Sequence, residues 1–383
     1  MKDAVIVKAK RTPIGKVGGI LSHLPPEKLI KPVLKSLIEG INPAEIDDVI
    51  LGNVVGPGGN IARLSSLEAG LPVTIPGVTI DRQCGSGLEA INLAARLVQS
   101  GAGAIFIAGG VESTSLAPWK VKKPVSIHDP RGPELYTRAR FSPESIGDPE
   151  MGEAAENVAE HYGVTRKEQD EWAYLSHMKA VEAQHENRFE EEVIAIDGVH
   201  QDEGPRPNTS LAKLSTLAPV FKHGGTVTAG NACPMNDGAA AVLVMSREKC
   251  RELGLKPIAR FVDSTTAGVD PHLLGIGPIP AVKKLWKRQG LCSKDIDLVE
   301  FNEAFASQVI ASLNSLEIPY EKVNQSGGAL ALGHPYGASG SILVTRLMSE
   351  IARGSKVSRG LATLGIGGGM GLATLFESME DIV

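Results

Sequence analysis

Hydrophobic residues along the chain alternate between short unbroken runs and longer stretches with helical spacing. Leu88–Ser100 places polar residues at every third or fourth position and stops at Gly101, which predicts a mostly buried helix. The short apolar runs predict β-strands at Ala4–Lys8, Val49–Val55, Ala104–Ala108, Ala239–Met245, Ile258–Asp263, Leu298–Phe301 and Leu361–Leu364. Strands that alternate with helices indicate an α/β protein.

The pattern contains a weak internal repeat. One segment, AEIDDVILGN before residue 54, resembles a second, KDIDLVEFNE before residue 304. Each is followed by a glycine-rich turn, a helix and an apolar strand that ends in glycines. Two similar α/β halves would meet with these turns facing one another, and a site between the halves is expected. Chance similarity between two α/β segments is the alternative interpretation.

A different kind of sequence, rich in proline and charge, lies roughly between Thr114 and Asn231. Helices are expected at Gly152–Tyr162 and Thr165–Asn187, the second with capping-box spacing between Thr165 and Glu168. The charged run Glu190–Glu192 is expected to be a solvated surface. We therefore predict one half at 1–113 plus 232–256, an inserted domain at 114–231, and a second half at 257–383.

Composition limits the function classes. With 383 residues and 42% hydrophobic content the chain can bury a large core, and a formal net charge of -5 argues against nucleic-acid binding. The four cysteines are far apart and form no CxxC pair, so neither a metal site nor a disulfide framework is expected. No apolar leader, no apolar stretch of about 18 residues and no carboxyl-terminal address is present, which favours the cytoplasm and no membrane. A small-molecule ligand fits best.

Cys84 is the first candidate for chemistry. It stands in DRQCGSGLEA, between an expected strand at Val78–Ile80 and the buried helix, with Gly85 and Gly87 permitting a tight bend. A thiol at a helix N-terminus feels about half a positive charge, which favours the thiolate. The alternative is a small buried cysteine without a chemical role.

Three further positions add candidate polar groups. His334 lies among glycines in a loop expected to lead into a helix near Ser341, where it could bind a thioester oxygen or accept a thiol proton. Asn302 follows an expected strand and could orient a water, or it could be a helix N-cap. The glycine run Gly365–Gly371 offers backbone amides to an oxyanion, or is simply a turn.

Taken together, these motifs resemble those of thiolases in order and approximate spacing, from Val5 to the carboxyl end. The strings that carry the resemblance are DRQCGSG, GNAxxxNDGAAA, NEAFA, GGALALGHPYGASG and TLxIGGGMG. The resemblance implies two similar βαβαβαββ halves that form a five-layered α-β-α-β-α body with an inserted loop domain that binds coenzyme A (CoA). It also implies a homodimer or homotetramer, and no cofactor besides CoA as substrate and product.

The resemblance also implies an acyltransferase mechanism. Cys84 would take an acyl group from a CoA thioester and pass it to a second thioester or to CoA, as in ping-pong covalent catalysis. His334 would activate the thiol and, with a water held by Asn302, form one oxyanion hole. The amides of Cys84 and Gly367 would form the other. Residues expected at CoA and the acyl group are Met151, Arg206, Lys213, Phe221, Ala229, Cys233 and Phe305.

The sequence departs from the family pattern at Gly365. Thiolases normally carry there a second catalytic cysteine, which removes the α-proton in the condensation step. Its loss is expected to cost about 10²–10⁴-fold in that step, whereas acyl transfer to Cys84 needs no such group. Gly365 would be either an engineered substitution or a natural loss.

Other departures lie along the expected substrate path. Cys233 replaces a CoA-contacting serine and is followed by Pro234 where glycine is usual, and we do not expect it to replace the missing thiol. Glu150 stands where short-chain members often place histidine, and Lys213 where they often place serine. Cys250 and Cys292 fall outside the motifs and are expected to be structural.

Three hypotheses follow. The first is an acetyl-CoA C-acetyltransferase or 3-ketoacyl-CoA thiolase impaired at Gly365. The second is a decarboxylating condensing enzyme that uses Cys84, His334 and Asn302 and needs no α-proton base. The third is a non-catalytic acyl-CoA-binding subunit.

Overall fold

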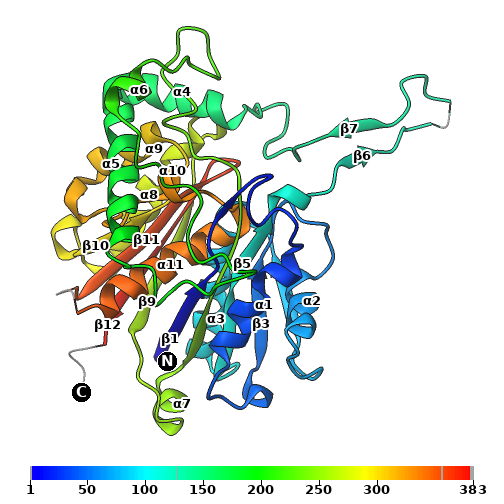
Figure 1. The fold of residues 1–383 in the computed structure, drawn as a ribbon, viewed down its shortest axis with the longest axis vertical. Helices are drawn as coiled ribbons and strands as arrows, with labels where there is room; N and C mark the ends of the chain where they lie inside the picture. The colour runs from blue at the N-terminus through cyan, green and yellow to red at the C-terminus, as the bar shows by residue number, and fades with distance from the viewer. Residues whose placement is uncertain (1, 127, 355–356, 380–383) are drawn as a thin grey trace.

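The computed structural model describes residues 2–126, 128–354 and 357–379, and its core is a mixed sheet covered by helices (Figure 1). This confirms the predicted α/β class. The strands of the main sheet are β1 (Ala4–Arg11), β2 (Gly15–Lys16), β3 (Asp48–Gly52), β4 (Gly77–Ile80), β5 (Ile105–Ser113), β8 (Asn236–Ser246), β9 (Ala259–Gly268), β10 (Leu298–Phe301), β11 (Arg359–Ile366) and β12 (Met370–Ser378). The helices are α1 (Pro26–Leu37), α2 (Ile61–Glu68), α3 (Ser86–Ser100), α4 (Met151–Tyr162), α5 (Arg166–His185), α6 (Leu211–Ser215), α7 (Arg247–Glu252), α8 (Pro278–Gln289), α9 (Ala306–Leu316), α10 (Ala329–Leu332) and α11 (Tyr336–Ala352).

The strand order confirms the predicted repeat. The path across the sheet is β10-β11-β12-β9-β1-β8-β5-β3-β4, with β2 beside β8. In the first half β3 is parallel to β5, which is antiparallel to β8, which is antiparallel to β1. In the second half β10, β11, β12 and β9 follow the same sequence of directions. The halves join where Val5 and Ile6 pair with Arg260 and Ala259.

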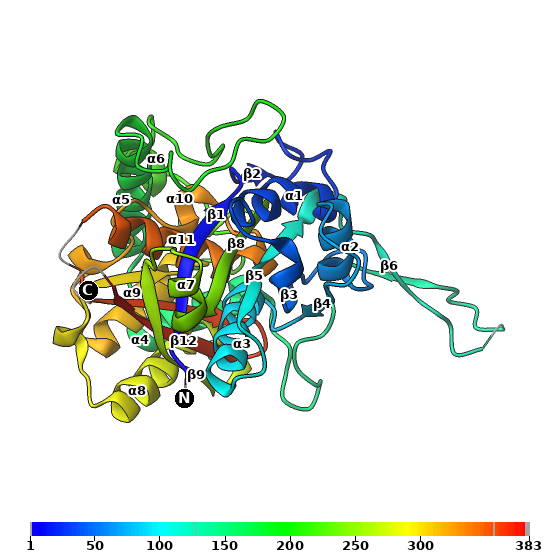
Figure 2. The same cartoon turned by 90° about the horizontal axis from the view of Figure 1, so that it is seen from below.

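Five layers result from the helices that cover and separate the two halves (Figure 2). α1 and α2 pack on the outer face of the first half-sheet, α8 packs on the outer face of the second, and α9 packs against α8. α3 and α11 pack against each other between the two half-sheets. Apolar clusters fill each gap between layers, and the middle one joins Leu88 and Ile91 of α3 to Val344 and Leu347 of α11. This is the arrangement expected from burying one apolar stripe per helix.

Glycines let α3 and α11 approach closely where they cross. A Cβ on Gly87 would lie 2.7 Å from the carbonyl oxygen of Gly337, so only glycine fits at that position. The predicted meeting of the two glycine-rich turns is therefore confirmed. Both helices begin at this crossing, and their N-termini point toward one region between the halves.

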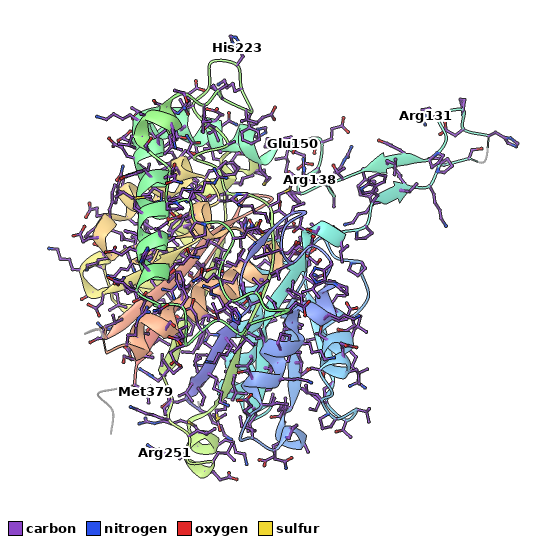
Figure 3. The ribbon with its side chains drawn as sticks, in the orientation of Figure 1. Arg131, Arg138, Glu150, His223, Arg251 and Met379 are labelled. Carbon is purple, nitrogen blue, oxygen red and sulfur yellow. The ribbon has the colours of Figure 1, made fainter. Side chains whose placement is uncertain are left out.

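The segment between β5 and β8 leaves the body. A two-stranded hairpin of β6 (Lys120–Lys122) and β7 (Glu134–Tyr136) projects outward (Figure 1), whereas α4, α5 and α6 pack over the second half. Arg131 lies towards the outer end of the hairpin, and Arg138 and Glu150 lie together at its base (Figure 3). The capping box between Thr165 and Glu168 at the start of α5 is confirmed.

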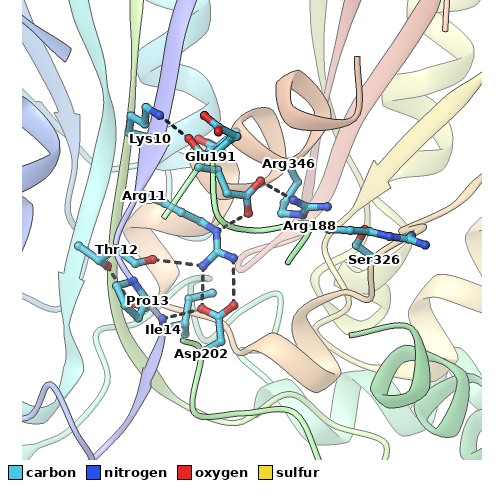
Figure 4. A network of polar contacts seen from close by, with 12 residues as sticks. Lys10, Arg11, Thr12, Pro13, Ile14, Arg188, Glu191, Asp202, Ser326 and Arg346 are labelled. Carbon is cyan, nitrogen blue, oxygen red and sulfur yellow. Dashed lines mark hydrogen bonds and ion pairs between the residues drawn. The ribbon is translucent and has the colours of Figure 1, made fainter. Parts of the chain in front are cut away.

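A buried ionic network ties this segment to the body (Figure 4). Arg11 at the end of β1 bonds Asp202 at 2.7 and 2.9 Å and Glu192 at 2.7 Å. Glu192 also pairs with Arg346 of α11, which bonds Glu350 at 2.6 Å. The prediction that 190–192 form a solvated surface is thus wrong for Glu192, which is 1% exposed, because two arginines neutralise it inside the protein.

Two other expectations need correction, and one strand was not predicted. α11 begins at Tyr336 instead of near Ser341, because the helical backbone starts directly after Pro335. The strand expected at Val49–Val55 ends at Gly52, where the chain turns beneath the start of α3. The strand β12 follows the glycine run and was not predicted, because its apolar residues were assigned to no element.

Candidate active site

Cys84 lies in the turn between β4 and α3, two residues before the helix begins. The turn requires unusual backbone: Gln83 has φ of 47°, in the left-handed region. Gly85 is the N-cap of α3, and a Cβ there would lie 2.5 Å from the side chain of Ile366. The sequence therefore places the thiol at the start of a buried helix, as predicted.

The surroundings of Cys84 favour the neutral thiol. Burial raises the pKa of Cys84 to about 11, although backbone amides of Gly367 and of Cys84 itself donate hydrogen bonds to the sulfur. The expectation that the helix N-terminus favours the thiolate is therefore wrong for the resting site, because desolvation outweighs it. The same two amides are the pair expected to stabilise an oxyanion.

His334 is buried between α10 and α11. Its backbone N–H donates to Asn236 Oδ1 at 2.9 Å, and its Nδ1 lies 2.6 Å from Ser339 Oγ. Burial lowers the pKa of His334 to about 4, so the ring is neutral at pH 7. Its Nε2 has no hydrogen-bond partner among the described residues. A buried ring nitrogen without a partner is available to a substrate or a thiol proton.

Tyr336 packs against His334 and lies near Cys84 and Cys233. The rings of His334 and Tyr336 are 5.1 Å apart and nearly perpendicular. The pKa of Tyr336 is raised by burial and by its proximity to Cys233 and Cys84. The histidine and the two cysteines therefore lie in one neighbourhood.

Asn302 lies directly after β10, and its backbone N–H donates to Thr363 of β11 at 3.1 Å. The N-cap interpretation is wrong, because α9 begins at Ala306 with Phe305 as its N-cap. In the described part of the chain Asn302 Nδ2 is buried without a partner. Asn302 and Ser339 line one cavity of about 20 Å³, large enough for a single water.

Gly365 is the next-to-last residue of β11 and pairs with Gly371 of β12. A Cβ at this position would point towards α9, 2.5 Å from Gln308 Nε2 and 3.0 Å from the carbonyl oxygen of Gly275. Gly365 therefore has no side chain that could act as an acid or base, and the amide of Gln308 lies opposite it. Gly367 follows in the turn and packs under Phe141, whose ring would lie 3.0 Å from a Cβ there.

Four of the expected substrate contacts gather beside this centre. The backbone N–H of Cys233 donates to Ala304 at 2.9 Å, next to Phe305. Phe305 meets Phe221 edge to face at 6.2 Å between ring centroids. Phe221 in turn covers Gly152, which follows Met151 at the start of α4. These residues form a partly apolar wall leading away from Cys84.

The remaining three expected contacts are exposed. Arg206 precedes α6, Lys213 lies on it and donates to Asn208 O at 2.6 Å, and Ala229 lies in a turn. All three belong to the segment that covers the second half. The structure does not bring them into contact with Cys84 or His334.

Three polar residues of this region were not predicted from the sequence. Ser339 orients His334, and Gln308 faces Gly365. Glu112, at the end of β5, accepts hydrogen bonds from Val54 and Gly337 amides at 3.0 Å, and burial raises its pKa to about 7. The position of Glu112 at a strand end was the available signal.

Two negative findings bear on other functions. Within residues 2–126, 128–354 and 357–379, no group of three or more His, Cys, Asp or Glu side chains is arranged to bind a metal. Over the same ranges no helix has the length and apolar character needed to cross a membrane. All four cysteines are described, and each is a free thiol.

Fold and site together define an α/β enzyme with a half-buried cysteine, whose sulfur accepts from two backbone amides, near a buried histidine. Comparison with known proteins is consistent with this class. The thiolase N-terminal domain model matches residues 4–248 and the thiolase C-terminal domain model matches residues 255–378.

Full-length relatives support the match to the thiolase domain models. Proteins named "Putative acetyl-CoA C-acetyltransferase VraB" are 51% identical in Staphylococcus haemolyticus, over 100% of both chains, and 51% identical in Staphylococcus epidermidis, over 98% and 99%. The crystal structure of an acetyl-CoA acetyltransferase from Bacillus anthracis superposes with a TM-score of 0.91 at 39% identity, covering 99% of each chain. The chain belongs to the thiolase family and is an acyltransferase.

Proposed function

We propose that the chain is an acetyl-CoA C-acetyltransferase or 3-ketoacyl-CoA thiolase that works through an acyl group on Cys84. The observation that carries the proposal is the geometry around the sulfur. The Gly367 amide reaches Cys84 Sγ, and in the same region the buried Nε2 of His334 and Nδ2 of Asn302 have no partner among the described residues. Orphaned buried donors and acceptors are costly unless a ligand satisfies them.

The first half-reaction follows from the hydrogen bonds of His334. Ser339 Oγ–H donates to the Pro335 carbonyl at 3.0 Å, so the Nδ1–H of His334 donates to Ser339 and Nε2 carries the lone pair. Nε2 would accept the Cys84 proton as the sulfur attacks the thioester carbonyl. The resulting Nε2–H, with a water on Asn302, would then stabilise the tetrahedral oxyanion. CoA would leave with this proton, and acyl-Cys84 would remain.

The second half-reaction is where Gly365 matters. The acyl group on Cys84 would pass to a second acetyl-CoA or, in the degradative direction, to free CoA. The amides of Cys84 and Gly367 would hold the acyl oxygen in this step. Thiolysis needs a proton acceptor for CoA and condensation needs a base for the α-carbon, and Gly365 supplies neither. Both directions would therefore be slow.

CoA itself would lie along the wall that begins at Cys233. Phe305, Phe221 and Met151 would contact the pantetheine and acyl portions, and Cys233 and Ala229 the pantetheine arm. Arg206 and Lys213 are exposed cations suited to phosphate groups. The chain would use no cofactor besides CoA as substrate and product, and it would consist of one half at 1–113 plus 232–256, an inserted domain at 114–231 and a second half at 257–383.

A homodimer or homotetramer is proposed because large apolar side chains lie open on the projecting hairpin. Trp119 is 82% exposed and Val125 94% exposed. Apolar groups of this size exposed along a projection are typical of a surface that a second copy covers. The cytoplasm is the proposed location, since a reducing compartment keeps Cys84 as a thiol.

A second candidate function rests on the missing side chain at Gly365. A decarboxylating condensing enzyme generates its carbanion by losing CO₂ and needs no base there. It would keep Cys84, His334 and Asn302 in their proposed roles. Efficient turnover of malonyl-CoA with acetyl-Cys84 would favour this candidate over the thiolase.

The test of the proposed function is acylation of the protein. Acetyl-CoA should add one acetyl group by mass spectrometry, and Cys84→Ala should abolish the addition. Cys292→Ala, which removes an exposed cysteine outside the site, should leave it unchanged. Labelling that persists in Cys84→Ala, or that maps to Cys233, would refute the assignment.

A further inference from the structure

Gln308 is a polar side chain that the proposed mechanism does not use. It lies on α9, close to the helix N-terminus, and is 2% exposed. Within the described chain its amide has no hydrogen-bond partner, and its Nε2 lies 2.5 Å from where a Cβ of residue 365 would be. A buried amide without protein partners is normally satisfied by water.

The water on Gln308 would lie close to the reacting carbon. Gly365 is two residues before Gly367, a separation of about 6–7 Å along an extended backbone. The amide of Gly367 donates to Cys84 Sγ. Because residue 365 has no side chain, the Gln308 amide reaches the place that such a side chain would take, and a water held by this amide would lie on the Gly365 side of Cys84.

An acyl-enzyme that lacks an α-proton base would persist until another nucleophile attacks it. The thioester on Cys84 would remain exposed to any nucleophile held beside it. The amides of Cys84 and Gly367 stabilise the oxyanion that water attack produces, as they do for any nucleophile. A neutral His334 with a free Nε2 can accept the proton of that water.

We propose that this site is also an acyl-CoA hydrolase, in which Gln308 positions the water that attacks acyl-Cys84. The proposal rests on the proposed acyl-Cys84 intermediate. The water oxygen bonds to the acyl carbon while its proton passes to His334 Nε2. The carbon–sulfur bond then breaks, the proton moves from His334 to Cys84 Sγ, and a carboxylic acid leaves. The sum is acyl-CoA plus water giving acid plus CoA, with no oxidant or reductant.

The decisive experiment uses the unmodified protein with acetyl-CoA in H₂¹⁸O. Free CoA should exceed one equivalent per chain, and acetate carrying one ¹⁸O should form in equal amount. Acetoacetyl-CoA, measured in the same samples, accounts for CoA released by condensation. Stable acetyl-Cys84 without labelled acetate would overturn the hydrolase and leave the acyl-enzyme intact. Absence of any acetyl-Cys84 would instead refute the proposed function.

Variants at residue 308 test the role of the amide. Gln308→Met keeps the length of the side chain and removes its hydrogen bonds. Hydrolysis should fall about tenfold, the size expected for one hydrogen bond to a reacting water, and acetyl-Cys84 should accumulate. Gln201→Leu, at an exposed glutamine outside the site, should not change either quantity. Equal hydrolysis in Gln308→Met and the unmodified chain would show that Gln308 does not hold the water.

Discussion

Replacing Gly365 with cysteine should convert a slow site into an efficient thiolase. The new thiol would stand at the end of β11, two residues before the amide that reaches Cys84 Sγ. There it can remove the α-proton of a second acetyl-CoA or protonate the product of thiolysis. Restoring a positioned general acid/base should increase both directions by about 10²–10⁴-fold, which corresponds to about 3–5 kcal/mol of barrier.

The structure indicates that the site can accept this side chain. The backbone of Gly365 is outside the left-handed region, so an L residue is not strained there. The obstacle is the end of Gln308, 2.5 Å from the new Cβ, and the fixed Gly275 carbonyl at 3.0 Å. Gln308 can rotate away because no hydrogen bond joins its side chain to another described residue. Overpacking should therefore lower the free energy of unfolding by about 1–3 kcal/mol.

The assay separates chemistry from packing. Steady-state rates of acetoacetyl-CoA formation and thiolysis would be measured with mass spectrometry of acyl-Cys84. Gly365→Ser carries a side chain of nearly the same size without an acidic thiol, so it should show the packing cost and no gain. Hydrolysis should fall in both variants, since each displaces Gln308. If Gly365→Cys equals Gly365→Ser while the unmodified chain condenses malonyl thioesters efficiently, the thiolase assignment is wrong.

Three further predictions concern groups already placed by the structure. His334→Ala should slow formation of acyl-Cys84 by about 10²–10⁴-fold in stopped-flow or quench measurements, and unchanged kinetics in a folded variant would make the histidine structural. Because burial raises the pKa of Cys84 to about 11, alkylation by iodoacetamide should accelerate about tenfold per pH unit from pH 7 to 10, and a plateau near pH 8 would contradict this. Glu192→Ala should lower the free energy of unfolding by about 3–5 kcal/mol in urea titrations, since it leaves Arg11 and Arg346 buried without their shared partner; a loss below about 1 kcal/mol would show that other groups or water neutralise the two arginines.

The linear sequence determined the elements whose signals are local. Cys84 after a strand and before a helix, the capping box at Thr165 and the apolar runs of both halves all follow from the order of neighbouring residues. The motif strings also indicated the family, and the family resemblance predicted the residues that surround Cys84. These features depend on residues that are neighbours in the sequence, so they can be predicted without knowledge of the tertiary structure.

Only the tertiary structure decided what depends on residues distant in sequence. Burial raised the pKa of Cys84 against the effect of its helix, because desolvation is set by the whole surrounding body. Glu192 became an interior charge because Arg11 and Arg346, from two different elements, converge on it. Gln308 of α9 faces Gly365 of β11 only through the folded arrangement, and no spacing along the chain relates these two residues. Proximity created by packing therefore fixed the electrostatics of the site and the group that fills the place of the missing thiol.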